Sequence, residues 1–144
     1  MNSPNAHKLY SLEVLRLATS LPHNDTLETP HASATCRAPL CGSEMTVEVA
    51  LDDTSRITGL ATRAKACALG QASAAVLRNK ALGQNAVQIR TVSDGLKSAL
   101  QKGSGELVWP ELEPFRYASD FPARHGAILL PFDTLIAALE KASH

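Results

Sequence analysis

Three cysteines and one histidine stand out in this 144-residue chain as residues that could hold a metal ion or carry sulfur: Cys36, Cys41, Cys67 and His125. Because three is an odd number, the cysteines cannot all pair in disulfides within one chain, and we expect thiols that either bind metal or are inert. Cys36 precedes Cys41 by five residues, which is not the Cys-x-x-Cys spacing typical of zinc knuckles. We interpret Cys36 as a packing residue rather than a ligand.

The local sequence around the other two cysteines favours exposed thiolates. Pro39 and Gly42 predict a tight loop around Cys41, because proline restricts φ and glycine permits a turn. Cys67 falls where a predicted strand gives way to a predicted helix, and the unpaired N–H groups at a helix start favour the thiolate. His125, near the start of the last predicted helix, is a candidate ligand or general base.

A predicted hairpin brings the two loops together. Residues 45–51 alternate apolar and polar side chains, residues 52–55 are typical of a turn, and residues 56–62 form a second predicted strand. The loop before the first strand and the loop after the second lie at the same end of such a hairpin. We therefore expect Cys41 and Cys67 to meet in a shared metal or sulfur site, with two unrelated cysteines as the alternative.

The remaining segments predict an α+β protein, with a small antiparallel sheet of about three strands packed against helices on one face, in a single domain spanning residues 1–144. Apolar residues recur at helical spacing in several segments, and Pro22 ends the first of them. The expected helices cover residues 7–20, 66–80, about 92–102 and about 122–141, with a poor edge strand around 31–37 and a looser stretch over 109–119.

Composition and charge exclude several classes of function. The 14 basic and 14 acidic residues balance, so a nucleic-acid partner is not expected, because such binding depends on neutralising phosphates. The apolar runs are too short to span a membrane, and the N-terminal residues do not resemble a secretory signal. We expect a cytoplasmic protein with no nucleic-acid or membrane partner. The sequence contains no phosphate-binding glycine loop and no hydrolase motif.

Several stretches together resemble one family, the U-type iron–sulfur cluster assembly scaffolds (IscU, SufU and the N-terminal part of NifU). Leu9-Tyr10-Ser11-x-x-Val14-Leu15 resembles the family's first helix, and Pro39-Leu40-Cys41-Gly42 resembles its Asn-Pro-x-Cys-Gly-Asp loop. Ala66-Cys67-Ala68-Leu69-Gly70-Gln71-Ala72-Ser73 resembles its Gly-Cys-x-Ile-x-x-Ala-Ser helix start, which is the most specific part. Phe121-Pro122-Ala123-Arg124 resembles the segment leading to the family's third cysteine.

The resemblance implies a site of three thiolates and one carboxylate around an Fe–S cluster, iron or zinc. Cys41 and Cys67 match the first two cysteines, whereas Ser43 stands at the carboxylate position and Ala127 at the third cysteine. Two thiolates alone hold a tetrahedral metal poorly. His125, or with less support Cys36, would complete the site, while Glu44 would point to the other side of its strand.

The leading expectation is a scaffold-like protein of iron–sulfur cluster assembly that binds iron, an Fe–S cluster or zinc through Cys41 and Cys67. One alternative is a degenerate relative that binds no metal and acts by protein interaction. Another is a zinc-dependent sulfur-transfer protein, although the cysteine expected to accept sulfur is Ala127 here. The resemblance implies a cysteine desulfurase and apo Fe–S proteins as partners. We expect no enzymatic activity beyond such a sulfur-carrier role.

Overall fold

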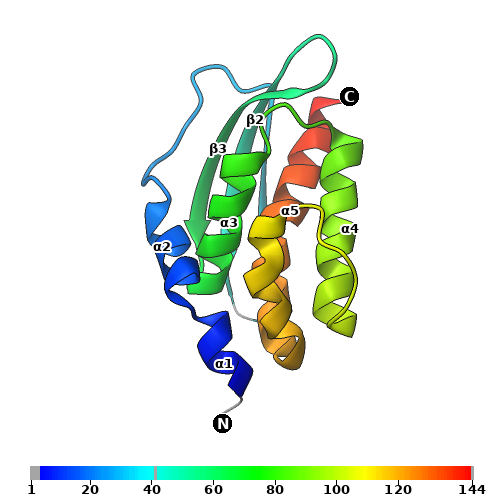
Figure 1. Cartoon of the computed structure of the whole chain (residues 1–144). Helices are drawn as coiled ribbons and strands as arrows, with labels where there is room; N and C mark the ends of the chain where they lie inside the picture. Colours follow the sequence, from blue (N-terminus) through cyan, green and yellow to red (C-terminus); the bar gives the residue numbers. More distant parts are fainter. Residues whose placement is uncertain (1–3, 41, 144) are drawn as a thin grey trace.

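The computed structural model describes residues 4–40 and 42–143, which form three strands, five α-helices and one 3₁₀ helix (Figure 1). Their order is α1 Pro4–Leu9, α2 Leu12–Ser20, β1 Ala32–Arg37, β2 Glu44–Leu51, β3 Ile57–Lys65, α3 Ala68–Lys80, α4 Ala86–Lys102, η1 Pro110–Asp120 and α5 Pro122–Ala142. This architecture confirms the α+β prediction.

The strands form one antiparallel sheet in the order β1-β2-β3, so β2 is central and the predicted edge strand is indeed at an edge. Met45, Val47 and Val49 of β2 are fully buried, as their alternation predicts, because successive side chains point to opposite faces of a strand. The turn between β2 and β3 is held by Asp52, whose carboxylate accepts hydrogen bonds from the N–H groups of Thr54 and Arg56.

Helices cover one face of the sheet (Figure 1). α5 packs on β1 and β2, α3 packs on β3, and α2 and α4 flank this pair by packing on α3 and α5 respectively. The loop before β1 lies along the β3 edge of the sheet, where Asp25 accepts the N–H of Thr62 at 3.2 Å and Arg63 donates to the Asp25 carbonyl at 2.8 Å. No helix among the described residues is long and apolar enough to cross a membrane.

The prediction of one helix over residues 7–20 is wrong, because the chain forms two helices that break at Tyr10 and Ser11. The Ser11 hydroxyl accepts the N–H of Val14 at 3.3 Å and so caps a new helix. Tyr10, at the break, is 39% exposed, whereas Leu9 is buried. A local cap therefore overrides the continuous apolar pattern.

Two of the later helical segments, α4 and η1, differ from the prediction. α4 begins at Ala86 rather than near residue 92, because Asn85 and Gln88 form a reciprocal capping box at its start. The looser stretch after Trp109 is a 3₁₀ helix with Pro114 inside it. α5 spans Pro122–Ala142, as expected, and continues through Pro131.

Candidate functional site

Cys67 is the N-cap residue of α3, two residues after the end of β3. Its side chain makes no capping hydrogen bond, and its thiol is free and half-buried against the core. Most N-cap side chains bond a backbone N–H of the first helical turn. Because Cys67 does not, its sulfur is left available for another partner.

The loop between β1 and β2 approaches the same end of the sheet. Ala38 donates its N–H to the Ser43 carbonyl at 2.9 Å, and Gly42 donates to the Ala38 carbonyl at 3.0 Å. Gly42 has φ of 71°, a left-handed conformation that glycine adopts readily. Cys41 lies outside the described residues, but the pairing of Glu44 with Lys65 puts this loop at the β3 end that leads to Cys67. The register confirms that the two loops lie at the same end of the hairpin, whereas the meeting of Cys41 and Cys67 stays a prediction.

The first turns of α5 form a third element of this region. A Cβ on Gly126 would lie 3.6 Å from the Cβ of Ala38, so α5 contacts the β1–β2 loop. A Cβ on Gly70 of α3 would lie 3.2 Å from the Ala127 carbonyl oxygen. The three positions matched to the family's cysteines therefore belong to segments that pack together, and Ala127 itself is fully buried.

The close approach of α3 to α5 has an identifiable cause. Pro131 has no N–H, so it cannot donate the usual helical hydrogen bond to the carbonyl of Ala127, four residues earlier. The small residues of α3 face this stretch of backbone: Gly70 lies against the Ala127 carbonyl, and the Ser73 hydroxyl donates to the Ile128 carbonyl at 2.6 Å. These contacts fix the start of α3 against α5.

His125 faces η1. Its Nε2 lies 2.7 Å from the carbonyl oxygen of Ala118, so Nε2 carries the proton and donates this bond. In the neutral ring, the lone pair available to a metal is then on Nδ1. His125 is two residues from Ala127, or about 200° around the helix, so the two side chains leave α5 on different faces.

The other residues that the sequence analysis named, Ser43, Glu44 and Cys36, differ in burial and in the partners they contact. Ser43 is buried, with 4% of its surface exposed. Glu44 lies on the opposite face of β2 from Met45 and pairs with Arg37 at 3.4 Å, as its strand position predicts. Cys36 is opposite Met45 in the register and packs partly buried against the core, and its exclusion as a ligand stays a prediction.

Among residues 4–40 and 42–143, no three His, Cys, Asp or Glu side chains are grouped to hold a metal ion. Of the three predicted metal ligands, these ranges contain two, the sulfur of Cys67 and the Nδ1 of His125. A complete ligand set at this end of the molecule therefore depends on Cys41.

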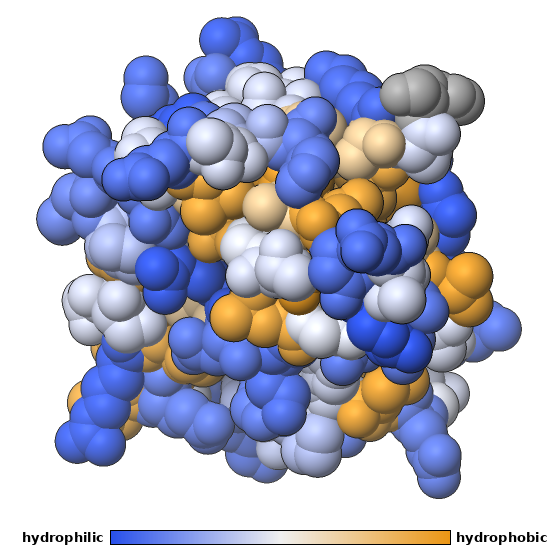
Figure 2. Space-filling view, turned by 90° about the horizontal axis from the view of Figure 1, so that it is seen from above, coloured by the Kyte–Doolittle hydropathy of each residue, from blue (hydrophilic) through white to orange (hydrophobic). Residues whose placement is uncertain are grey.

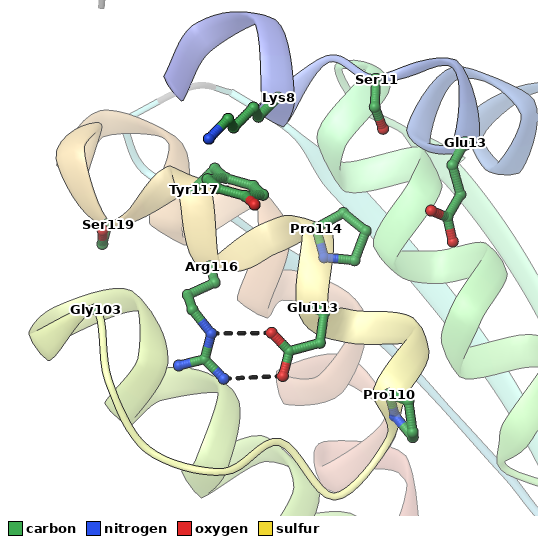
Figure 3. A pocket seen from close by; sticks show the side chains of 10 residues that line it. All are labelled: Lys8, Ser11, Glu13, Gly103, Pro110, Glu113, Pro114, Arg116, Tyr117 and Ser119. Atoms are coloured by element: carbon green, nitrogen blue, oxygen red, sulfur yellow. Dashed lines mark hydrogen bonds and ion pairs between the residues drawn. The ribbon is translucent and has the colours of Figure 1, made fainter. Parts of the chain in front are cut away.

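A hollow of about 630 Å³ lies elsewhere, between α1, η1 and the end of α4 (Figure 3). The Lys8 ammonium lies 5.3 Å from the centre of the Tyr117 ring, and Arg116 makes two 3.0 Å bonds to Glu113. The hydrogen bond from Arg116 lowers the pKa of Glu113. The described lining includes no cysteine, so this hollow is not the predicted site.

The end of the molecule with the β2–β3 turn presents apolar side chains among polar ones (Figure 2). Leu82 and Val87, at the α3–α4 connection, are 56% and 70% exposed. β3 runs from this end towards Cys67, so this apolar surface is remote from the region where the three segments converge (Figure 1).

Sequence reasoning assigned no role to two residues that hold this region together, Gln71 and Pro131. Gln71 donates its side-chain amide to the carbonyl of Ala66 at 2.8 Å, next to Cys67. Its position four residues after the N-cap could have indicated a contact with the helix start, because such a residue lies one helical turn from the cap. Pro131 carried the opposite signal, since proline in a helix interior usually indicates a break.

The fold and this region define a small α+β protein that presents a cysteine at the junction of a sheet and a helix. A comparison with protein families matches residues 9–104 to the NifU-like N terminal domain. No curated protein matches the chain. The chain belongs to the family of NifU-like N-terminal domains.

Solved structures agree with this assignment. A nitrogen-fixing NifU-like protein (N-terminal) from Brucella abortus is 30% identical, with a TM-score of 0.85 over 96% of this chain and 97% of that chain. A proposed iron–sulfur cluster assembly scaffold protein for the SUF system from Fervidobacterium islandicum AW-1 is 22% identical, with a TM-score of 0.81 over 93% and 98%. At this lower identity, the second match shows the fold alone.

Proposed function

We propose that this chain acts in iron–sulfur cluster assembly as a scaffold-like protein. The thiolates of Cys41 and Cys67 hold its cargo, which is iron, an Fe–S cluster or zinc. Family membership supports the general role. The observation that carries the proposal is that the start of α5 packs against both the β1–β2 loop and the start of α3, where the Cys67 side chain makes no capping hydrogen bond.

His125 is the candidate third ligand, and it would bind through Nδ1 while Nε2 keeps its bond to Ala118. A backbone carbonyl that holds the second ring nitrogen is a common way to orient a histidine ligand. The proposal places the protein in the cytoplasm. It gives the protein a cysteine desulfurase and apo Fe–S proteins as partners.

A second candidate function is protein interaction without metal. Two observations favour it: Ala127 supplies no donor where the family resemblance places a third cysteine, and Ser43 supplies no carboxylate. In this case the protein would dock a desulfurase or an apo target through the family fold. Zinc-dependent sulfur transfer is a third candidate, with sulfur carried on Cys41 or Cys67.

The deciding experiment is metal analysis and visible absorption of the full chain purified without oxygen, before and after cluster reconstitution. The variants are Cys41→Ala and Cys67→Ala, with Cys36→Ala as the matched control because Cys36 packs against the core. We expect iron or zinc in the wild type and in C36A, and a loss of about tenfold or more in affinity in C41A and C67A. His125→Ala should weaken binding to a smaller extent.

Three results would separate the candidates. Wild-type protein that holds only trace iron and zinc, and that fails reconstitution, removes the scaffold proposal. A stable complex with a desulfurase under those same conditions supports the interaction role. Persulfide label on Cys41 or Cys67 after mixing with a desulfurase supports sulfur transfer, and its absence from both cysteines rejects it.

A further inference from the structure

Gln71 makes two hydrogen bonds to the backbone around Cys67. Its backbone N–H donates to the Cys67 carbonyl at 3.0 Å, which is the first hydrogen bond of α3. Its side-chain Nε2 donates to the Ala66 carbonyl at 2.8 Å. The carbonyls of Ala66 and Cys67 belong to the two peptide planes that meet at the Cα of Cys67.

These two bonds restrict both backbone angles of Cys67. Each peptide unit is planar, so rotation about φ turns the Ala66–Cys67 plane and rotation about ψ turns the Cys67–Ala68 plane. Gln71 holds the oxygen of each plane. Because φ and ψ together with the tetrahedral Cα set the direction of the Cα–Cβ bond, Gln71 fixes the direction in which the Cys67 side chain leaves the backbone, and only rotation about χ1 remains to place the sulfur.

The Cys67 side chain does not restrain the backbone in the same way, because it makes no capping hydrogen bond. The sheet register ends where Glu44 pairs with Lys65, so the carbonyl of Ala66 lies beyond the strand ladder and needs another partner. The Gln71 amide is that partner.

The Gln71 side chain is itself held in place. It is half-buried and lines a hollow of about 240 Å³ together with Ala18 and Leu21 near the end of α2 and Thr62 and Ala64 of β3. α2 packs on α3 beside it. The neighbouring α2 and β3 restrict the space open to the amide, which favours its bond to Ala66.

We infer that Gln71 is a positioning residue for Cys67. It orients the Cα–Cβ bond of Cys67 at the junction of β3 and α3. The expected effect on metal binding rests on the proposed function, whereas the restraint of the Cys67 backbone by Gln71 does not. Partners that orient a metal ligand in this way typically change metal affinity by about 10–100-fold when they are removed.

The test compares Gln71→Met with Gln71→Lys. Methionine has a similar length and shape but cannot donate a hydrogen bond, whereas lysine keeps a donor on a long side chain. Gln71→Glu, which keeps the size and replaces the donor by an acceptor, is the second loss variant should the methionine variant fold poorly. Gln88→Met is the matched control, because Gln88 also bonds the backbone at a helix start, at Asn85 of the α4 cap.

The first readout is the ¹⁵N order parameter of the Cys67 amide in the metal-free full chain. We expect a value typical of rigid backbone, about 0.85, in the wild type, in Q71K and in Q88M, and a fall towards about 0.6 in Q71M. An unchanged value in Q71M overturns the inference, whatever the metal results are. A value that falls equally in Q88M also overturns it, because the effect would then be general loosening.

The second readout uses Co²⁺ as a spectroscopic probe of the proposed site. In Q71M we expect an altered thiolate-to-cobalt absorption band and about tenfold weaker Co²⁺ binding, with Q88M unchanged. Wild-type protein that takes up no Co²⁺ counts against the proposed function alone, and a lower order parameter in Q71M would still support the positioning role. Tight Co²⁺ binding with an identical spectrum in Q71M rejects the role of Gln71 at the metal.

Discussion

The Cα of Gly70 in α3 lies against the carbonyl oxygen of Ala127 in α5, so closely that a Cβ on Gly70 would be 3.2 Å from that oxygen. The same Cβ would be 2.9 Å from the Cβ of Ala66, a separation that real side chains essentially never show. This contact joins the helix that begins after Cys67 to the helix that carries His125. It therefore sets the geometry of the region where we propose that cargo binds.

Gly70→Ala should lower the free energy of unfolding by about 1–3 kcal/mol, because the added methyl group has no space between Ala66 and the Ala127 carbonyl. Urea unfolding followed by circular dichroism measures this change. Gly126→Ala is the control, because it is also a helical glycine but its Cβ would meet Ala38 at an ordinary 3.6 Å. We expect G126A to be neutral or more stable, and a G70A variant as stable as G126A would contradict the tight contact.

Ala127→Cys combined with Ser43→Asp should raise the amount of zinc or iron retained after purification. The double variant restores a thiolate and a carboxylate at the positions where the family resemblance places them, and four donors suit a tetrahedral metal better than two. Ala138→Cys is the control, because Ala138 is also fully buried and lies three turns further along nearly the same face of α5. Equal metal content in A127C/S43D and A138C would argue against a site at this end.

Asp52→Ala should lower the stability of the protein against unfolding at neutral pH, and the loss should be smaller in acid. The pKa of Asp52 is lowered by the hydrogen bond from the Arg56 N–H and by the one from the Thr54 hydroxyl. A carboxyl group with a lowered folded pKa stabilises above its ordinary pKa, and this stabilisation is lost as the pH falls through the folded pKa. Urea midpoints of wild type and D52A should converge as the pH is lowered below the ordinary aspartate range.

Asp53→Ala tests whether that effect belongs to the turn bonds, since the Asp53 carboxylate takes no part in them. Its urea midpoint should track the wild type at both neutral and acidic pH. If D53A and D52A show the same pH dependence, the cause is the general charge of the turn rather than the hydrogen bonds of Asp52.

Asp25→Ala should release the loop before β1. The Asp25 carboxylate accepts from Arg78 at 3.0 Å and from the N–H of Thr62 at 3.2 Å, and it is 17% exposed. Hydrogen bonds to such charged groups contribute about 1.5–3 kcal/mol. We expect a loss of stability in this range and faster proteolysis within residues 22–30, measured by mass spectrometry of limited digests.

Glu140→Ala is the comparison for that variant. Glu140 pairs with Arg90 at the same 3.0 Å, but its side chain is 58% exposed and that of Arg90 is 47% exposed. Ion pairs of this kind contribute less than about 1 kcal/mol. A loss in E140A as large as that in D25A would mean that burial is not what gives Asp25 its effect.

Local patterns predicted most of the secondary structure. Alternation in 45–51 identified β2 and its buried face because the period of a strand is two residues, and the turn after it follows from aspartate and serine chemistry. The break at Ser11 and the early start of α4 at Ala86 were missed, because one capping bond decides a helix boundary and apolar periodicity does not record it.

By itself, the sequence determined the sheet, its hairpin and the position of Cys67 at the start of a helix, since these depend on residues close together in the chain. Only the tertiary structure decided how α3 meets α5, because Ser73 and Ile128 are 55 residues apart and their bond depends on packing around Pro131. Tertiary structure also decided that His125 faces Ala118, because the buried face of α5 sets the rotation of this helix about its axis.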